Sequence, residues 1–442
     1  MKRFYLRSLL LALGVSFMIG NSTTTAAELK PIKKPAKSVI LIFLTGGPSQ
    51  TDTFDPKPDA GRDYAGQYKA PIKTNVEGIY INENLKELAK ITDKYSIIRS
   101  MSHGSNAHET GQYVMYTGDM SRGTLVYPSF GSMISYQFRD SYKGLLPPYI
   151  SVPNSSTRFN ESGFLGVEYK SYNTGGAPER KFFEVEGIIN RRVPNKQLEY
   201  KKRLLDGFNK LSTNRVEQTS EVEKYKGLQE DNFELILGES RKIFDLESET
   251  PELRKKYGMT RIGQSCLVAR KLVEAGTPVV VVNSTGWDTH KEHFKRMNQM
   301  LSSVDMAISA LITDLEDKGL LDDTIILCGG EFGRTPRIGW EPPWNGGRGH
   351  FGAAFSYLVA GGGFKGGVVI GETDKTGENV TKRPVYPADF WGTIYYMMGI
   401  DPNSTYPHVQ MGEIPILPPT PTDGKFAPSE GIVVELIEES RL

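Results

Sequence analysis

The sequence contains little cysteine, no pronounced excess of charge and no hydrophobic run long enough to span a membrane comfortably. Only two cysteines occur among its 442 residues, Cys266 and Cys328, and neither belongs to a C-x-x-C pair. This excludes a cysteine-based zinc site and a disulfide framework. Both cysteines lie in apolar segments, so we expect two buried thiols, with a single disulfide as the alternative. The net charge of +1 lacks the basic excess that a phosphate backbone requires, so we expect no nucleic-acid partner.

The N-terminal segment, residues 1–27, has the layout of a secretory signal peptide. Its basic start holds Lys2, Arg3 and Arg7. An apolar stretch, Leu9–Ile19, follows, and then small polar residues up to Ala27. This stretch is too short for a comfortable membrane span, so we expect cleavage after Ala27 and an exported protein without a stable membrane span. An uncleaved anchor is the alternative.

Short apolar, β-rich runs alternate with helical patterns along the rest of the chain. The predicted strands are Ser38–Leu44, Tyr95–Ile98, Pro278–Val282, Thr324–Leu327 and Tyr357–Ala360. Such continuous runs suit strands that are buried on both faces, as in a parallel sheet. The predicted helices are Asn84–Lys94, Arg261–Glu274 and Glu292–Lys318. This alternation predicts an α/β fold with a doubly wound, mostly parallel sheet and helices on both faces.

Two segments depart from this alternation. The stretch from about residue 169 to 245 is rich in Lys, Arg and Glu and reads mostly as helix from Asn195 onward, so we expect a helical insertion or cap. The stretch from about residue 413 is rich in proline, so we expect a tail that wraps over the surface. We therefore expect one α/β domain over residues 28–442.

Five of the six histidines lie in glycine-rich or polar loops beside predicted strands or helix starts: His103, His108, His290, His293 and His350. Open α/β sheets bind ligands at the carboxyl ends of their strands, so these loops are candidates for a site. The loop that follows the third predicted strand combines Asp288, His290 and His293. Oxygen and nitrogen ligands together favour zinc, manganese or iron over calcium. A hydrogen-bonded loop without metal is the alternative.

The loops after the first two strands supply further candidates. Asp52 follows the first strand and is a candidate ligand for a divalent cation, or a residue that caps a turn. Asn106 and Glu109 fit a capping box, which predicts a helix that begins near Ala107. His108 would then lie at a helix N-terminus, where free N–H groups favour an anion. A plain helix cap with a surface histidine is the alternative.

The last two loops contain a carboxylate and two arginines between glycines. Glu331 follows the fourth predicted strand and is a candidate metal ligand or general base. Arg334 and Arg348 each carry a planar guanidinium suited to holding an oxyanion. His350 follows Arg348 in a glycine-rich loop. The alternatives are a salt bridge between Glu331 and an arginine, and a glycine-rich turn.

Taken in order, these motifs resemble a family named "domain of unknown function 1501". The residues that carry the resemblance are GGPSQTDTFDPKP (Gly46–Pro58), GWDTH (Gly286–His290), GEFGRTP (Gly330–Pro336) and GRGHF (Gly347–Phe351). The family is in turn similar to the alkaline phosphatase and sulfatase superfamily, whose members hydrolyse phosphate or sulfate esters at one or two metal ions. The resemblance implies an alkaline-phosphatase-like (sulfatase-like) fold and a divalent metal, zinc or manganese.

The resemblance also implies roles for individual residues. It places Asp288, His290 or His293, and His350 at metal-binding positions, with Asp52 as the nearest substitute for a lost aspartate. It places His108 at the nucleophile position, Glu331 at a ligand position and Phe332 where a histidine ligand is lost.

Two hypotheses follow. The first is an exported metal-dependent hydrolase of a small anionic ester or of a sulfated or phosphorylated glycan. His108, Glu331, Arg334 and Arg348 would be catalytic, and the nucleophile would be water, His108 or a hydroxyl such as Ser49, Thr51 or Thr110. The second is a catalytically degenerate relative that binds an anionic ligand or polysaccharide or acts as a scaffold. The sequence specifies no oligomeric state.

Overall fold

The structure is a computed structural model that describes residues 30–120, 125–155, 161–190, 192–213, 220–408, 410–420 and 427–442. The predicted signal peptide, residues 1–27, lies outside these ranges. Among the helices in these ranges, none has the combination of length and hydrophobicity needed to cross a lipid bilayer.

Eight strands form one central sheet: β1 (Ser38–Leu44), β4 (Tyr95–Met101), β5 (Tyr149–Val152), β6 (Tyr172–Asn173), β7 (Val279–Ser284), β8 (Thr324–Gly329), β11 (Phe355–Ala360) and β12 (Val369–Ile370). Their order is β12-β4-β11-β8-β1-β7-β5-β6. β11 is antiparallel to both of its neighbours, and the other pairs are parallel. The carboxyl ends of β1, β4, β5, β7 and β8 therefore lie at the same edge of the sheet as the amino end of β11.

The shorter strands form two-stranded pairs outside this sheet: β2 (Ile72–Lys73) with β3 (Tyr80–Ile81), β9 (Gly333–Arg334) with β10 (His350–Phe351), β13 (Glu372–Thr373) with β14 (Val380–Lys382), and β15 (Thr405–His408) with β16 (Gly412–Pro415). The helices are α1 (Arg62–Ala65), α2 (Lys86–Ala89), α3 (His108–Thr117), α4 (Phe130–Gln137), α5 (Asn195–Thr213), α6 (Ser220–Leu237), α7 (Pro251–Tyr257), α8 (Arg261–Glu274), α9 (His293–Asp317) and α10 (Pro387–Met397).

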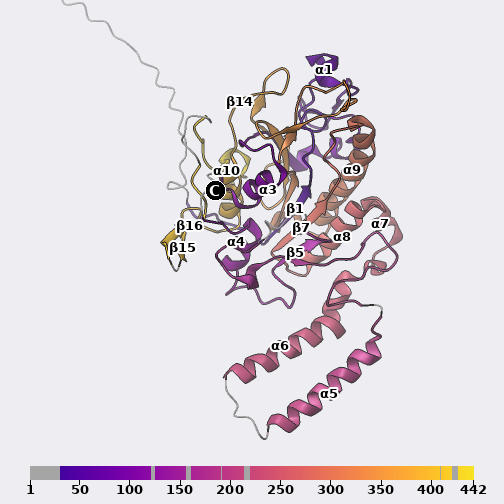
Figure 1. Ribbon diagram of the computed structural model, residues 1–442, viewed down its shortest axis with the longest axis vertical. Coiled ribbons are helices and arrows are strands. Elements are labelled where there is room, and N and C mark those ends of the chain that lie inside the picture. The colour runs from indigo at the N-terminus through magenta and orange to yellow at the C-terminus, as the bar shows by residue number, and fades with distance from the viewer. Residues whose placement is uncertain are drawn as a thin grey trace, which may run out of the picture.

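Helices cover both faces of the sheet, as Figure 1 shows with α8 and α9 on one side and α3, α4 and α10 on the other. The alternation of side chains along β1 explains why two layers are needed. Ile40, Ile42 and Leu44 belong to the hydrophobic cluster that includes α8 and α9. Val39, Leu41 and Phe43 belong to the cluster that includes α3, α4 and α10. The α/β fold predicted from the sequence, with a mostly parallel sheet and helices on both faces, is confirmed.

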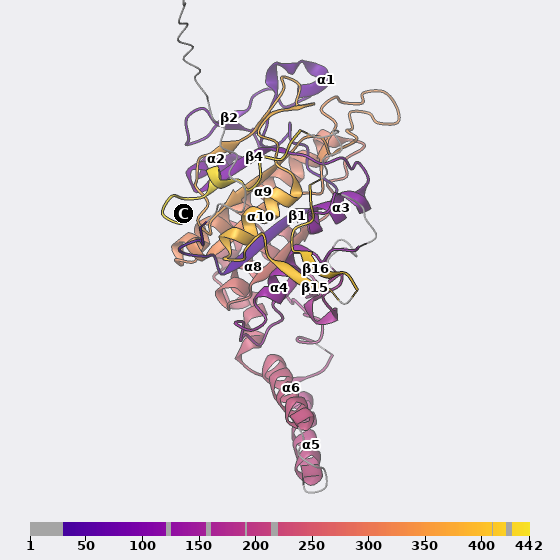
Figure 2. The same cartoon turned by 90° about the vertical axis from the view of Figure 1, so that its left-hand side faces the viewer.

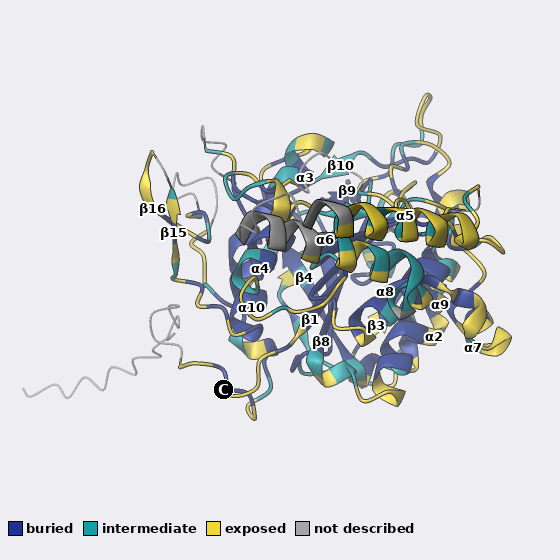
Figure 3. Ribbon diagram, turned by 90° about the horizontal axis from the view of Figure 1, so that it is seen from below, coloured by how far each residue is buried: buried dark blue, intermediate teal, exposed yellow. Residues whose placement is uncertain are grey.

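The charge-rich stretch contains a helical hairpin, α5 and α6, that extends away from the body of the molecule (Figures 1 and 2). Figure 3 shows α5 mostly exposed, whereas the strands of the sheet are buried. The preceding part of the stretch adds β6 to one edge of the sheet. The boundaries expected for the insertion and for the tail stay predictions.

Two local predictions were wrong. The helix predicted over Asn84–Lys94 is limited to α2, because the backbone N–H of Asn75 donates to the carbonyl of Ala89 (2.8 Å), which a longer helix would use internally. The capping box was also wrong, because Ala107 precedes α3 without a side-chain cap. The strand β5 was not predicted from the sequence. The prediction of buried thiols is confirmed for both cysteines.

Replacing Arg270 by methionine should lower the free energy of unfolding by about 3–5 kcal/mol, because it leaves the buried carboxylate of Asp314 without its cation. Arg270 is 1% exposed, lies 3.0 Å from Asp314 and also pairs with Glu249 and Glu274. The control is Lys90→Met, which removes a solvent-exposed pair with Glu87 and should cost less than about 1 kcal/mol. Urea unfolding measures both, and equal losses would contradict this role.

Candidate metal centre

Polar side chains from four loops meet at one edge of the sheet. His108 comes from the segment after β4, Asp288 and His290 from the loop after β7, Glu331 from the loop after β8, and His350 from β10, shortly before β11. The topology places the ends of all these strands at this edge. Chain segments far apart in the sequence are thus brought together by the direction of the strands alone.

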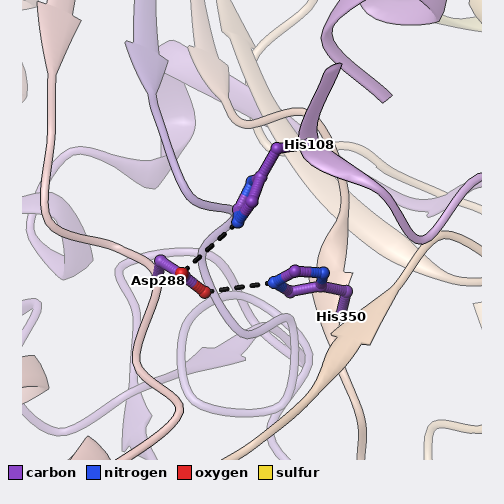
Figure 4. A group of neighbouring side chains, drawn as sticks. All are labelled: His108, Asp288 and His350. Carbon is purple, nitrogen blue, oxygen red and sulfur yellow. Dashed lines mark hydrogen bonds and ion pairs between the residues drawn. The ribbon is translucent and has the colours of Figure 1, made fainter. Parts of the chain in front are cut away.

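The carboxylate of Asp288 lies at the centre of this group. Its Oδ1 is 3.1 Å from Nε2 of His350 and 3.0 Å from Nε2 of His290. Its Oδ2 is 3.4 Å from Nε2 of His108. Figure 4 shows the side chains of His108 and His350 pointing toward Asp288. Three imidazoles therefore present the same ring nitrogen to one carboxylate.

Hydrogen-bond acceptors orient two of these imidazoles by binding Nδ1, the ring nitrogen that does not face Asp288. Nδ1 of His350 lies 2.7 Å from the carbonyl oxygen of Asn106. A carbonyl oxygen can only accept, so this nitrogen donates. Nδ1 of His108 donates in the same way to Oε1 of Glu331 (2.7 Å). In a neutral imidazole the other nitrogen, Nε2, then carries the lone pair. This arrangement, with a carbonyl or carboxylate behind the ring, is typical of histidine ligands of metals.

His290 completes the group and lies next to His350. Its Nε2 lies 2.8 Å from Nε2 of His350, so the pair needs a proton or a cation between the two nitrogens. In the described part of the chain, its buried Nδ1 has no hydrogen-bond partner. The ring packs beside Trp344, with the ring centroids 5.2 Å apart.

The donor set fits a divalent ion. Two ligands about 2.1 Å from one tetrahedral zinc ion lie roughly 3.4 Å apart, and the separations from Asp288 to His108 and His350 are 3.4 Å and 3.1 Å. His108, Asp288 and His350 can each place one ligand atom within 4.8 Å of the others. Nitrogen and carboxylate ligands together favour zinc or another transition metal.

The local electrostatics favour an ionised carboxylate. Burial by itself raises the pKa of Asp288, but the hydrogen bond from Arg334 outweighs it and holds this pKa at about 2. The hydrogen bond to Glu331 raises the pKa of His108, whereas burial lowers the pKa of His290. Asp288 therefore carries its negative charge throughout the physiological range.

Asp52 and His293, two of the predicted ligands, lie in a separate buried cluster with Arg348. Oδ2 of Asp52 is 2.8 Å from Nε2 of His293 and 2.7 Å from Nε of Arg348. Nδ1 of His293 is 2.6 Å from the hydroxyl of Thr289. All three side chains are at most 1% exposed. They hold one another beneath the loop that carries Asp288.

The two arginines predicted to stabilise an anionic substrate are buried and hydrogen-bonded within the protein. Nη2 of Arg334 donates to Oδ1 of Asp288 (2.6 Å), and its Nε donates to the carbonyl of Gly47 (3.0 Å). Arg348 donates to the carbonyls of Thr335 and Tyr64 in addition to pairing with Asp52. Both guanidinium groups therefore position loops.

Glu331 also has its acceptor sites occupied. Its carboxylate is fully buried and accepts from the backbone N–H of Gly46 (2.9 and 3.0 Å) and from Gln112 (3.4 Å), besides holding His108. Its backbone carbonyl accepts a hydrogen bond from His103 (2.6 Å). His103 thus supports the loop of Glu331 and lies outside the group around Asp288.

Several residues that contribute to the site were not predicted from the sequence. Asn106 was interpreted as a cap, but its carbonyl orients His350 and its side chain accepts from the N–H of Gly352 (2.7 Å). The N–H of Gly46 and the rings of Trp344 and Phe332 were not assigned roles. The glycine belonged to a quoted motif, but a backbone donor leaves no signal in a side-chain pattern.

Of the hydroxyls named as candidate nucleophiles, those of Ser49 and Thr51 are buried and lie 3.2 Å apart.

Comparison with solved structures finds distant similarities only. Solved structures similar to this chain are sulfatases and proteins of the alkaline phosphatase superfamily. The PsFucS1 sulfatase from Pseudoalteromonas sp. is 15% identical with a TM-score of 0.37, over 83% of this chain and 68% of that chain. Ps i-CgsB in complex with k-i-k-neocarrahexaose is 13% identical with a TM-score of 0.38, over 83% and 72%. A mutant TAB5 alkaline phosphatase with bound Mg is 11% identical with a TM-score of 0.37, over 83% and 98%.

The chain itself belongs to the family described as "Protein of unknown function (DUF1501)", whose model matches residues 36–417. This confirms the family resemblance of the sequence motifs. No curated protein matches the sequence. Structural likenesses this distant identify neither a substrate nor a reaction.

Replacing Gly46 by alanine should weaken zinc binding at least about tenfold, as loss of a group that orients metal ligands does. Gly46 has φ +114°, and an added Cβ would lie 2.3 Å from the backbone nitrogen of Asp288. The control is Gly61→Ala, which has a similar φ of +84° and nothing within 4 Å of the new Cβ. Competition with a chelator measures the affinity, and equal affinities in the two variants would contradict the role of this contact.

Acid should destabilise the protein partly through Asp52. Burial raises the pKa of this carboxyl, but Arg348 and His293 outweigh burial and hold it at about 2. Since the unfolded value is about 3.9, the stabilisation is complete above that pH and is lost as the pH falls toward 2, by about 2–3 kcal/mol. Unfolding in urea at pH 5 and pH 2 should show a smaller difference in Asp52→Asn than in the wild type. The same difference in both proteins would contradict the assignment.

Proposed function

We propose that the chain is an exported metal-dependent hydrolase of phosphate or sulfate esters. Its divalent ion, zinc or manganese, would be held by Asp288 and by Nε2 of His108 and His350, with His290 next to them. The observation that carries the proposal is the convergence of three imidazole Nε2 atoms on one ionised carboxylate. His108 is then a metal ligand rather than the nucleophile.

The chain's own residues prepare this centre for an anionic substrate. A bound divalent ion would supply Lewis acidity that polarises a phosphoryl or sulfuryl oxygen. Asp288 is 43% exposed and His108 33% exposed, so solvent and a small ester reach the group. Glu331 and Asn106 fix the directions of the imidazoles, and Arg334 fixes the carboxylate. Such preorganisation avoids reorientation during reaction.

A second candidate, binding of an anionic ligand or polysaccharide without turnover, is favoured by the arginines. Arg334 and Arg348 are fully buried and donate to carbonyl groups and carboxylates of the protein. The guanidinium groups that the sequence suggested for the oxyanion therefore already have partners. In this alternative the metal centre would anchor a ligand rather than activate an ester.

Metal content and turnover of aryl phosphates and aryl sulfates test the two candidates together. The wild type should bind one zinc or manganese ion per chain and hydrolyse one class of ester. Asp288→Asn and His350→Ala should each lower metal affinity at least about 100-fold. Loss of a residue that only hydrogen-bonds to a metal ligand already lowers metal affinity about 10–100-fold. Turnover should fall with the metal.

Two matched controls separate a ligand from a merely polar residue. His408→Ala removes an imidazole on β15, outside the site, and should leave metal content and turnover unchanged. Asp52→Asn acts through the network beneath the loop of Asp288, so it should lower stability and weaken metal binding much less than Asp288→Asn does. A wild type that binds metal but hydrolyses neither ester would favour the binding protein, and a wild type that binds neither ion would refute both uses of the centre.

A further inference from the structure

A cavity lies at the carboxyl ends of β5 and β7. Its volume is about 490 Å³, within the usual range of small-molecule sites. The loop after β5 contributes Asn154 and Ser155, and the end of β7 contributes Asn283. The cavity also reaches Trp287, whose neighbour in the chain is Asp288. One loop therefore borders both the cavity and the metal centre.

The second wall of the cavity comes from the first turns of α9. Gln299, Met300 and Ser303 line it there, and α9 begins at His293, directly after the loop that carries Asp288 and His290. Thr260 and Ile262 line it at the start of α8. The cavity is therefore built from the regular elements of the domain, which hold its shape.

The chemistry of this lining is neutral. Among the lining residues that the structure describes, the polar side chains other than Arg261 and Trp287 are amides and hydroxyls, and none is a carboxylate. Arg261, a cation of this described lining, hydrogen-bonds to Glu179 (3.2 and 3.0 Å). Apolar side chains such as Met300 and Val304 complete the walls. A neutral lining of amides and hydroxyls beside apolar surface suits a molecule with many hydroxyl groups and apolar C–H faces, and supplies no unpaired charge for a separate anion.

We infer that this cavity binds the sugar moiety of a substrate whose phosphate or sulfate ester lies at Asp288. Binding of a neutral saccharide is a property of the cavity alone. Its use as the subsite for an ester rests on the function proposed above. Binding energy from the sugar would hold the ester beside the metal centre, as contacts remote from the reacting atoms do in many enzymes.

The first experiment measures whether the cavity binds a neutral sugar, in the absence of metal and of any hydrolysis. Metal-free protein is titrated with a panel of neutral disaccharides built from galactose, glucose, mannose or fucose, by calorimetry and by saturation-transfer NMR. At least one should bind the wild type. Ser303→Trp, which fills the cavity, should weaken this binding at least tenfold, and Gln299→Ala should weaken it in the same direction.

The matched control is Ser302→Trp, the same change at the exposed neighbouring position of α9, outside the lining. It should bind the disaccharide as the wild type does. Gln299 is exposed, so its alanine variant provides a readout if Ser303→Trp fails to fold. No binding by any member of the panel, or equal binding by the Ser303 and Ser302 variants, would overturn the inference.

Kinetics then separate the two proposals. With sulfated or phosphorylated forms of the bound disaccharide, Ser303→Trp should raise KM at least tenfold and leave hydrolysis of the aryl esters nearly unchanged. A KM for the sugar ester that does not change would overturn the subsite. Disaccharide binding without turnover of any ester would instead leave the cavity in place and refute the proposed hydrolase.

Discussion

The ion pair between Asp288 and Arg334 determines where the candidate site can form. The guanidinium of Arg334 is fully buried, and a buried charge must be compensated by partners because water cannot solvate it. Its partners are the carbonyls of Gly46 and Gly47 and one oxygen of Asp288. This single side chain therefore joins the loops after β1, β7 and β8. It fixes the carboxylate at the point where imidazoles arrive from two further segments.

A second buried network supports this arrangement from beneath. Thr289 follows Asp288 in the chain; its hydroxyl is 2.6 Å from Nδ1 of His293, and its carbonyl accepts from the N–H of Arg348 (3.3 Å). Asp52 neutralises Arg348 at 2.7 Å. The loops that carry Asp288 and His350 are thus held by a cluster of charges that does not reach the surface. A partly satisfied network of this kind is costly, so each member depends on the others.

Much of the fold can be predicted from the hydrophobic pattern of the sequence. Which histidines lie at the candidate metal centre cannot be predicted in this way. The continuous apolar runs identified β1, β4, β7, β8 and β11, and strand direction placed their loops at one edge. The sequence could not distinguish His290 from His293, three residues apart, because α9 begins at His293 and turns that ring toward Asp52. Similarly, Asn106 had the right spacing for a cap, but its polar groups bond across the site to residues about 245 positions away. These outcomes depend on tertiary contacts that no local pattern encodes.

The ring of Phe332 limits how many side chains can gather around Asp288. Its ring stacks on His350 with a centroid separation of 4.7 Å and lies 5.1 Å from the ring of His108. A Cβ on Gly47 would lie 2.6 Å from this phenyl ring, and one on Gly111 would lie 3.0 Å away, so the glycines at these positions make room for it. The ring orients two imidazoles toward Asp288 and fills the adjoining space with carbon, which offers a cation no ligand. Within the described ranges, the ligands beside Phe332 therefore suit a single ion, and the aromatic wall lowers the local polarity around it, which strengthens the attraction between a cation and the carboxylate of Asp288.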